Sequence, residues 1–255
     1  MDFASGHIYH VYNRGNNSQT IFYTRENYLF FLEKLRKYIL PHADVLAWCL
    51  MPNHFHLMIL VKQVEVEISE QVASDGVSEQ VTLGTEFDPM TWAHRINNQE
   101  ESVTHPMNSM FSEQVTFDGI SEGFTSSETL TKLTRTRTLN DSIGIILRSY
   151  SRAIQKQEKT TGSLFQKETK ALCLTEPQGV SLAYFNSHFG MMGNLDLSET
   201  NYLNVCFDYI HLNPVSVKLA AEPEDWEFSS YRDYFCGRKG KLINRESAKE
   251  LGLIT

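Results

Sequence analysis

Residues 51–61 read MPNHFHLMILV, a Pro-Asn turn followed by an apolar run that contains two histidines. Side chains alternate between the two faces of a β-strand. A strand over 54–61 therefore has one wholly apolar face, expected against helices, which is made by Phe55, Leu57, Ile59 and Val61. Its opposite face carries His54, His56, Met58 and Leu60. The two imidazoles leave that face roughly 7 Å apart along the strand, close enough to share one cation.

The segments before this run supply its partners. ADVLAWCLM at 43–51 predicts a strand that pairs antiparallel with 54–61 across the Pro-Asn connection. HIYHVYNRG at 7–15 is aromatic and β-prone, which predicts a first strand. Between them, 24–40 has helical spacing of apolar residues behind a Thr24 cap. The order up to residue 61 is therefore β-α-β-β.

The C-terminal part completes a second half. SIGIILRSYSRAIQKQEK at 142–159 is helical in pattern, and the second half of 163–175 predicts a closing strand. The resulting order β-α-β-β-α-β is typical of a ferredoxin-like α+β fold, with two helices on one face of a four-stranded antiparallel sheet. A further helix near 200–212 is expected to end at Asn213-Pro214 and to pack on this core.

Between the two halves lies a segment of different composition. SEQV occurs three times, at 69–72, 78–81 and 112–115, and the segment is rich in Ser, Thr, Glu and Gly. Residues 64–130 hold 13 acidic residues and one basic residue, so the rest of the chain carries a net charge of +4 although the whole carries -8. We expect 1–255 to form a single domain in which 63–140 is a weakly ordered, acidic insertion.

Composition excludes several classes of protein. The 255 residues contain no apolar run of the ~20 residues that a membrane helix needs, and the first residues lack the pattern of a signal peptide. The four cysteines are widely spaced, which indicates neither a zinc ribbon nor a disulfide framework. We therefore expect a cytoplasmic protein without a membrane partner.

An HxH pair alone is most often two half-exposed histidines at the end of a hairpin. The sequence, however, resembles the single-tyrosine HUH transposases, and in particular the REP-associated tyrosine transposases. The resemblance rests on five blocks in the family's order: HVYNRGNN at 10–17, WCLMPNHFHLMILV at 48–61, LRSYSRAIQKQ at 147–157, GSLFQK at 162–167 and YIHLNPV at 209–215.

The resemblance implies a DNA strand transferase that acts on single-stranded or hairpin-ended DNA, as a monomer or homodimer. In such enzymes two histidines and a third side chain hold Mg²⁺ or Mn²⁺, and a tyrosine on a helix attacks a backbone phosphate. A 5′-phosphotyrosine link and a free 3′-hydroxyl result. The matched positions are His54 and His56 for the metal, with Gln155 as the nearest amide for a third ligand, and Tyr150 for the nucleophile.

Chemistry supports these assignments. A phenol with a pKa near 10 is a weak nucleophile at neutral pH, so it needs a metal on the scissile phosphate. Tyr150 has Arg148, Ser149, Ser151 and Arg152 as neighbours, which favours an exposed position over the ordinary alternative of a core aromatic. The expected phosphate contacts are Arg14, Arg148, Arg152 and Lys156.

Two alternatives remain open. The first is a DNA-binding relative with a regulatory role that has lost efficient cleavage, which is favoured by Glu168 at a position where the family tends to have a basic residue, by Gln155 and by the acidic insertion. The second is an unrelated metal-dependent phosphoesterase that uses the histidines alone and does not need Tyr150.

Overall fold

A computed structural model describes residues 1–72, 131–176 and 199–255 of the chain. The chain divides into two compact units. One consists of Met1–Glu67 and Thr136–Thr255, and the other is Ile68–Arg135. The first unit contains both halves of the β-α-β-β-α-β pattern, so the residues singled out by the sequence all lie in it.

The centre of the first unit is a four-stranded sheet. Its strands are β1 (Ile8–Arg14), β2 (Ala43–Met51), β3 (His54–Val61) and β6 (Lys170–Cys173). They lie in the order β2-β3-β1-β6, and every neighbouring pair is antiparallel. Helix α1 (Arg25–Tyr38) connects β1 to β2, and α3 (Leu139–Glu158) precedes β6. The predicted ferredoxin-like α+β arrangement is confirmed, with β3 and β1 as its central strands.

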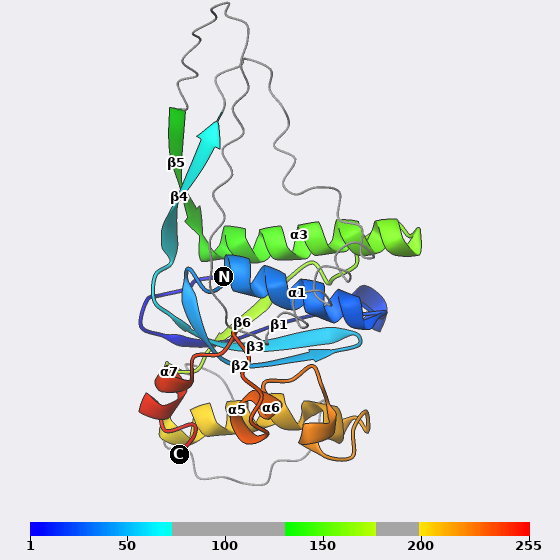
Figure 1. Cartoon of the computed structure of the whole chain (residues 1–255), viewed down its shortest axis with the longest axis vertical. Coiled ribbons are helices and arrows are strands. Elements are labelled where there is room, and N and C mark those ends of the chain that lie inside the picture. Colours follow the sequence, from blue (N-terminus) through cyan, green and yellow to red (C-terminus); the bar gives the residue numbers. More distant parts are fainter. Residues whose placement is uncertain (73–130, 177–198) are drawn as a thin grey trace, which may run out of the picture. The chain divides into compact units, whose positions relative to one another are not determined.

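One face of the sheet is covered by α1 and α3, which pack on each other (Figure 1). The apolar face of β3 meets this layer, since the ring of Phe55 lies 5.1 Å from that of Phe31 in α1. Thr24 precedes α1 as predicted, and its backbone N–H donates to the Asn27 side chain at 3.1 Å. Helix α3 begins three residues before the predicted start, because Thr138 caps it by accepting from the Asp141 backbone N–H at 3.1 Å.

The other face is covered by α5 (Glu199–Ser216), with α6 (Tyr231–Phe235) and α7 (Arg245–Glu250) in the same layer (Figure 1). Met58 of β3 belongs to a buried core here with Cys206, Phe207 and Ile210 of α5. The helix does not end at Asn213 as predicted but continues through Pro214. Pro214 lies in the last turn, where its missing N–H removes a single i→i−4 bond.

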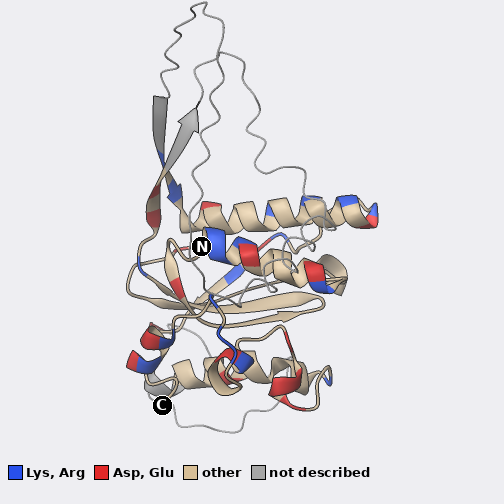
Figure 2. Cartoon of the chain, viewed as in Figure 1, with Lys and Arg blue, Asp and Glu red and all other residues tan. Residues whose placement is uncertain are grey.

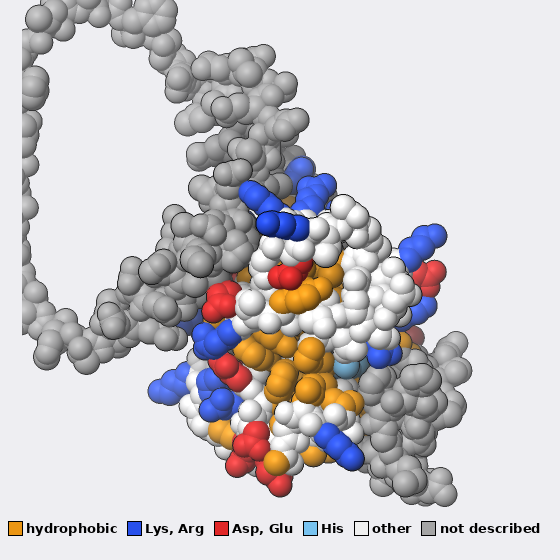
Figure 3. Space-filling model, turned by 90° about the vertical axis from the view of Figure 1, so that its right-hand side faces the viewer, with side chains coloured by type: hydrophobic (Ala, Val, Ile, Leu, Met, Phe, Trp, Pro, Cys, Tyr) orange, Lys and Arg blue, Asp and Glu red, His pale blue; other side chains and the backbone are white. Residues whose placement is uncertain are grey.

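The layer beneath the sheet also has apolar groups on its outside. Hydrophobic side chains gather on the side of the molecule that Figure 3 shows, where α5 ends. The exposed large hydrophobic residues at the end of α5, just beyond it and in α6 are Leu212, Val217, Leu219 and Phe235.

The ends of the acidic segment differ from the prediction. Strands β4 (Glu65–Val72) and β5 (Thr131–Thr138) form a two-stranded sheet of their own, where the sequence indicated no regular structure. Val and Glu alternate at the start of β4, and Thr recurs at every second position at the end of β5. Both patterns are compatible with strands, although the repeat-rich composition of the segment hides them. The predicted weak order of 73–130 lies outside the described residues and stays a prediction.

The division into units generates a first prediction. Replacing residues 68–135 with a short Gly-Ser linker should leave the first unit folded, because its sheet and both of its helix layers come from the remaining residues. Thermal unfolding followed by circular dichroism should stay cooperative. A broad transition without cooperativity would show that the segment contributes to the core.

Candidate functional site

The histidines of β3 lie on the face predicted for them, but that face is closed by α5. His54 is 6% exposed and His56 is 4% exposed. The His56 ring lies 5.4 Å from the ring of Tyr209 in α5. The predicted position opposite the apolar face of β3 is confirmed, whereas the ordinary alternative of two half-exposed histidines at the end of a hairpin is wrong.

A third histidine and an asparagine complete this buried cluster. His10 of β1 bonds through Nε2 to His56 Nδ1 at 2.9 Å, and the rings are stacked with centroids 5.0 Å apart. Asn213 Nδ2 lies 3.2 Å from His56 Nε2. With the amide as donor, His56 accepts at Nε2, so the neutral ring carries its proton on Nδ1 and donates to His10. Hydrogen bonds therefore fix the tautomer of His56.

Asn213 connects the cluster. The Asn213 side chain also lies close enough to His54 and Tyr209 to influence the pKa of each. The Asn213 amide therefore lies beside both imidazoles of β3. Sequence reasoning missed His10 and Asn213, although both stand in blocks that carry the family resemblance, HVYNRGNN and YIHLNPV.

Burial keeps the cluster neutral. Desolvation lowers the pKa of His10 to about 3 and that of His54 to about 4. It lowers the pKa of His56 well below the ordinary value, and the neighbouring His54 and His10 add to this effect. At pH 7 all three imidazoles are therefore uncharged, which is the protonation state of a metal ligand but also that of a buried hydrogen-bond network.

The residues present do not fit a Mg²⁺ site. Mg²⁺ prefers oxygen ligands in octahedral geometry, and the cluster offers three imidazoles and one amide. Both ring nitrogens of His56 are hydrogen-bonded. Within the described ranges, no group of three or more His, Cys, Asp or Glu residues is placed to hold a metal ion.

Gln155 does not join the histidines. It lies on α3, on the other side of the sheet, and its Nε2 donates to the carbonyl oxygen of Gly162. The structure therefore gives no support to Gln155 as the third metal ligand.

Tyr150 is a core residue in the layer opposite the histidines. Its side chain is fully buried, and its hydroxyl donates to the backbone oxygen of Ile21 at 2.7 Å. Its ring lies 5.0 to 6.0 Å from four aromatic rings, those of Phe22, Phe30, Phe31 and Phe165. Burial raises its pKa well above the ordinary value of 10. The predicted exposure of Tyr150 is wrong, and the structure does not bring its hydroxyl together with His54 and His56.

Two other tyrosines do lie beside the histidines. The ring of Tyr12 is 5.9 Å from that of His56, and Tyr209 is closer at 5.4 Å. Tyr12 is half-buried on β1, and burial raises its pKa to about 12. Burial likewise raises the pKa of Tyr209. Both hydroxyls are protonated at neutral pH.

The predicted phosphate-binding residues lie in two places. Arg14 is half-buried at the end of β1, opposite His54 in the strand register. Arg148, Arg152 and Lys156 are exposed on α3, along which Figure 2 shows a succession of positions coloured as Lys or Arg. Arg148 and Arg152 also line a cleft of about 850 Å³ between α3 and residues 162–171. The structure thus places Arg148, Arg152 and Lys156 on one helix and Arg14 at the end of β1, where its backbone oxygen accepts from the N–H of Gln166.

The structure was compared with solved structures, and the sequence with protein families and curated proteins. No family model matches the sequence, and no curated protein matches it. The structure is similar to that of a REP-associated tyrosine transposase bound to a REP hairpin, with 10% sequence identity and a TM-score of 0.41. The similarity covers 96% of this chain and 86% of that chain. None of the helices in the described ranges combines the length and apolar character that crossing a bilayer requires.

The position of Tyr150 generates a prediction of stability. Tyr150→Phe should lower the free energy of unfolding by about 1 to 2 kcal/mol, because it removes a buried hydroxyl and leaves the Ile21 carbonyl oxygen without this donor. Tyr23→Phe, at a side chain that is 42% exposed, is the matched control and should change little. Equal stability of the two variants in urea unfolding would contradict the buried hydrogen bond.

The histidine cluster generates a prediction of pH dependence. The pKa values of His10 and His54 are below the ~6.5 of the unfolded chain, so the unfolded chain binds protons that the folded chain does not. The free energy of unfolding should have its full value above about pH 6.5 and should decrease as the pH is lowered toward 4. Between pH 6.5 and 5 most carboxylates remain ionised, so the loss in this range belongs to histidines.

Urea unfolding at several pH values, with a chelator present, measures this dependence. His54→Gln should make the slope shallower by at most about 1.4 kcal/mol per pH unit, which is the share of one histidine. A parent protein whose stability is constant from pH 6.5 to 5 would show that the imidazoles are solvated.

Proposed function

We propose that this protein binds single-stranded or hairpin-ended DNA with a transposase-type fold, and that Tyr150 serves its core and not strand cleavage. The observation that carries the proposal is the placement of Tyr150 and the histidine pair on opposite sides of the sheet. The motif blocks that resemble the REP-associated tyrosine transposases point to DNA as the partner.

The burial of Tyr150 argues against its use as a nucleophile. To attack a phosphate, its hydroxyl would have to leave the Ile21 carbonyl oxygen and its ring would have to leave the aromatic core around Phe31. Removing a large aromatic side chain from a core typically costs about 3 to 5 kcal/mol. That cost is a large part of the stability of an ordinary domain.

Charge supports DNA binding. Outside 64–130 the chain carries a net charge of +4, and exposed arginines stand on α3 at Arg148 and Arg152. Contacts between basic side chains and phosphates supply most of the affinity of non-specific DNA binding and weaken as salt increases. A binding protein of this type needs neither a nucleophile nor a cofactor.

A second candidate is metal-dependent strand transfer, the activity that the resemblance implies. One observation favours it: the rings of His54 and His56 lie 5.0 Å apart, with Asn213, Tyr12 and Tyr209 beside His56. This candidate requires Asn213 to release the imidazoles, and the nucleophile would be a tyrosine of the cluster.

A covalent-capture experiment distinguishes the two candidates. Purified protein is incubated with a labelled hairpin that has unpaired flanks, with Mn²⁺ or Mg²⁺, and run on a denaturing gel beside a native binding gel. We expect a retarded complex on the native gel and no protein-linked band on the denaturing gel. His54→Ala should leave the complex in place, because phosphate contacts lie elsewhere.

Three outcomes would contradict the proposal. Absence of any complex at low salt would remove DNA as the partner. A covalent band lost in Tyr150→Phe would show that α3 rearranges to expose this tyrosine. A band lost in Tyr12→Phe or Tyr209→Phe would establish the second candidate.

A further inference from the structure

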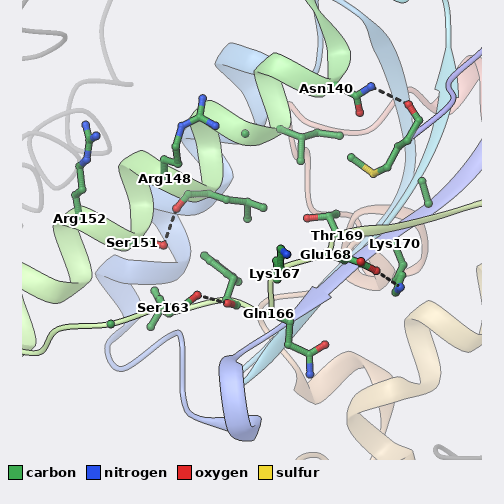
Figure 4. Close-up of a pocket in the computed structure, with 18 of the residues that line it drawn as sticks. Asn140, Arg148, Ser151, Arg152, Ser163, Gln166, Lys167, Glu168, Thr169 and Lys170 are labelled. Carbon is green, nitrogen blue, oxygen red and sulfur yellow. Dashed lines mark hydrogen bonds and ion pairs between the residues drawn. The ribbon is translucent and has the colours of Figure 1, made fainter.

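The strongest unassigned feature is the cleft between α3 and residues 162–171 (Figure 4). We propose that this cleft binds the sugar-phosphate backbone of an unpaired DNA strand, through Arg148 and Arg152 on one side and Lys167 on the other. The inference rests on the proposed function and names the part of the molecule that performs it. The cleft belongs to the side of the sheet that carries α3, away from the histidine cluster.

The charges in the cleft suit successive phosphates. Arg148 and Arg152 are four residues apart, and in Figure 4 their side chains rise in the same direction from α3 and away from residues 162–171, while Lys167 lies on the other side of the cleft. Four residues of an α-helix advance about 6 Å, which is comparable with the step between successive phosphates of an extended strand. The two guanidinium groups can therefore contact neighbouring phosphates at the same time.

The acidic residue of the cleft does not cancel these charges. Glu168 is paired with Lys170, with Nζ and Oε2 2.7 Å apart, and both side chains are more than half exposed. In the part of the chain that the structure describes, no ion pair joins Arg148, Arg152 or Lys167 to a carboxylate. The presence of Glu168 in place of a basic residue is thus compatible with a phosphate site.

A glycine positions one of the arginines. A Cβ atom at Gly144 would lie 2.7 Å from Nη1 of Arg148, so the guanidinium group lies directly over the bare backbone of α3. Glycine inside a helix is unfavourable relative to alanine. Here it leaves the space in which Arg148 folds back along the cleft, and any side chain at position 144 would displace the guanidinium.

The remaining lining indicates how the strand is recognised. Leu147 is half-buried and supplies apolar surface, whereas Ile143, Leu164 and the aromatic residue of the lining, Phe165, are each only 5% exposed. The cleft therefore lacks an exposed ring on which a base could stack, which is the usual source of base contacts in single-strand binding. Its volume is about 850 Å³. We expect backbone recognition without preference for base sequence.

Fluorescence anisotropy with labelled oligonucleotides tests the inference. The probes are a hairpin with a six-nucleotide unpaired flank, the same hairpin with a blunt end, and unlabelled abasic deoxyribose-phosphate hexamer as competitor. The parent protein should prefer the flanked hairpin, and the abasic hexamer should compete for that preference. Arg148→Ala with Arg152→Ala should reduce the affinity for the flanked hairpin by about tenfold or more and should flatten its salt dependence.

Two further variants separate position from charge. Arg36→Ala removes an exposed arginine of α1 outside the cleft and should leave the preference for the flank unchanged. Gly144→Ala keeps every charge but displaces the Arg148 guanidinium, so it should weaken binding of the flank while the melting temperature stays equal or rises. A structural role of Gly144 alone would not produce that combination.

The outcomes separate this inference from the proposed function. If the parent protein prefers the flanked hairpin and the double arginine variant keeps that preference, the cleft is not the site, although DNA binding stands. Binding of blunt and flanked hairpins with equal affinity would likewise overturn the cleft as a single-strand site. If the parent binds no probe, both proposals fall.

Discussion

The burial of both faces of β3 is the constraint on which the rest of the structure depends. Its apolar face lies under α1 and α3, and its histidine face lies under α5. A strand buried on both sides cannot keep charged imidazoles, because desolvation disfavours the protonated ring. His56 therefore stays neutral and must satisfy both nitrogens by hydrogen bonding, which His10 and Asn213 do.

The elements of the fold could be predicted because their signals are local. The alternation over 54–61 and the helical spacing over 24–40 gave strand β3 without error and α1 within two residues at either end. Strand order then follows from the small number of ways in which β-α-β-β-α-β can pair. The partners of the histidines could not be predicted in this way, because Asn213 and His56 are 157 residues apart and no periodicity connects them.

The error at Tyr150 arose from reading neighbours along the chain instead of around the helix. Residues four and seven positions away share a helical face. Ile143, Ile146 and Ile154 stand at these distances from Tyr150, and all three are buried with it. The adjacent serines did not signal exposure, because Ser149 and Ser151 donate to the carbonyl oxygens of Ile145 and Leu147 within the helix. The spacing of Tyr150 from these three isoleucines therefore indicates a buried position, although its immediate neighbours in RSYSR are polar.

The positions of Tyr150 and of the proposed phosphate contacts around α3 are also linked by helical geometry. Arg148 and Arg152 stand two residues before and after Tyr150, and two residues correspond to about 200° around an α-helix. Once the ring of Tyr150 enters the core, both guanidinium groups must point to the opposite side. A rotation of α3 that exposed Tyr150 would turn Arg148 and Arg152 toward the core, where unpaired charges are costly. In one orientation of this helix, therefore, Tyr150 cannot be exposed as a nucleophile while the two arginines are exposed to phosphate, and in the observed orientation Tyr150 is buried and both arginines are exposed.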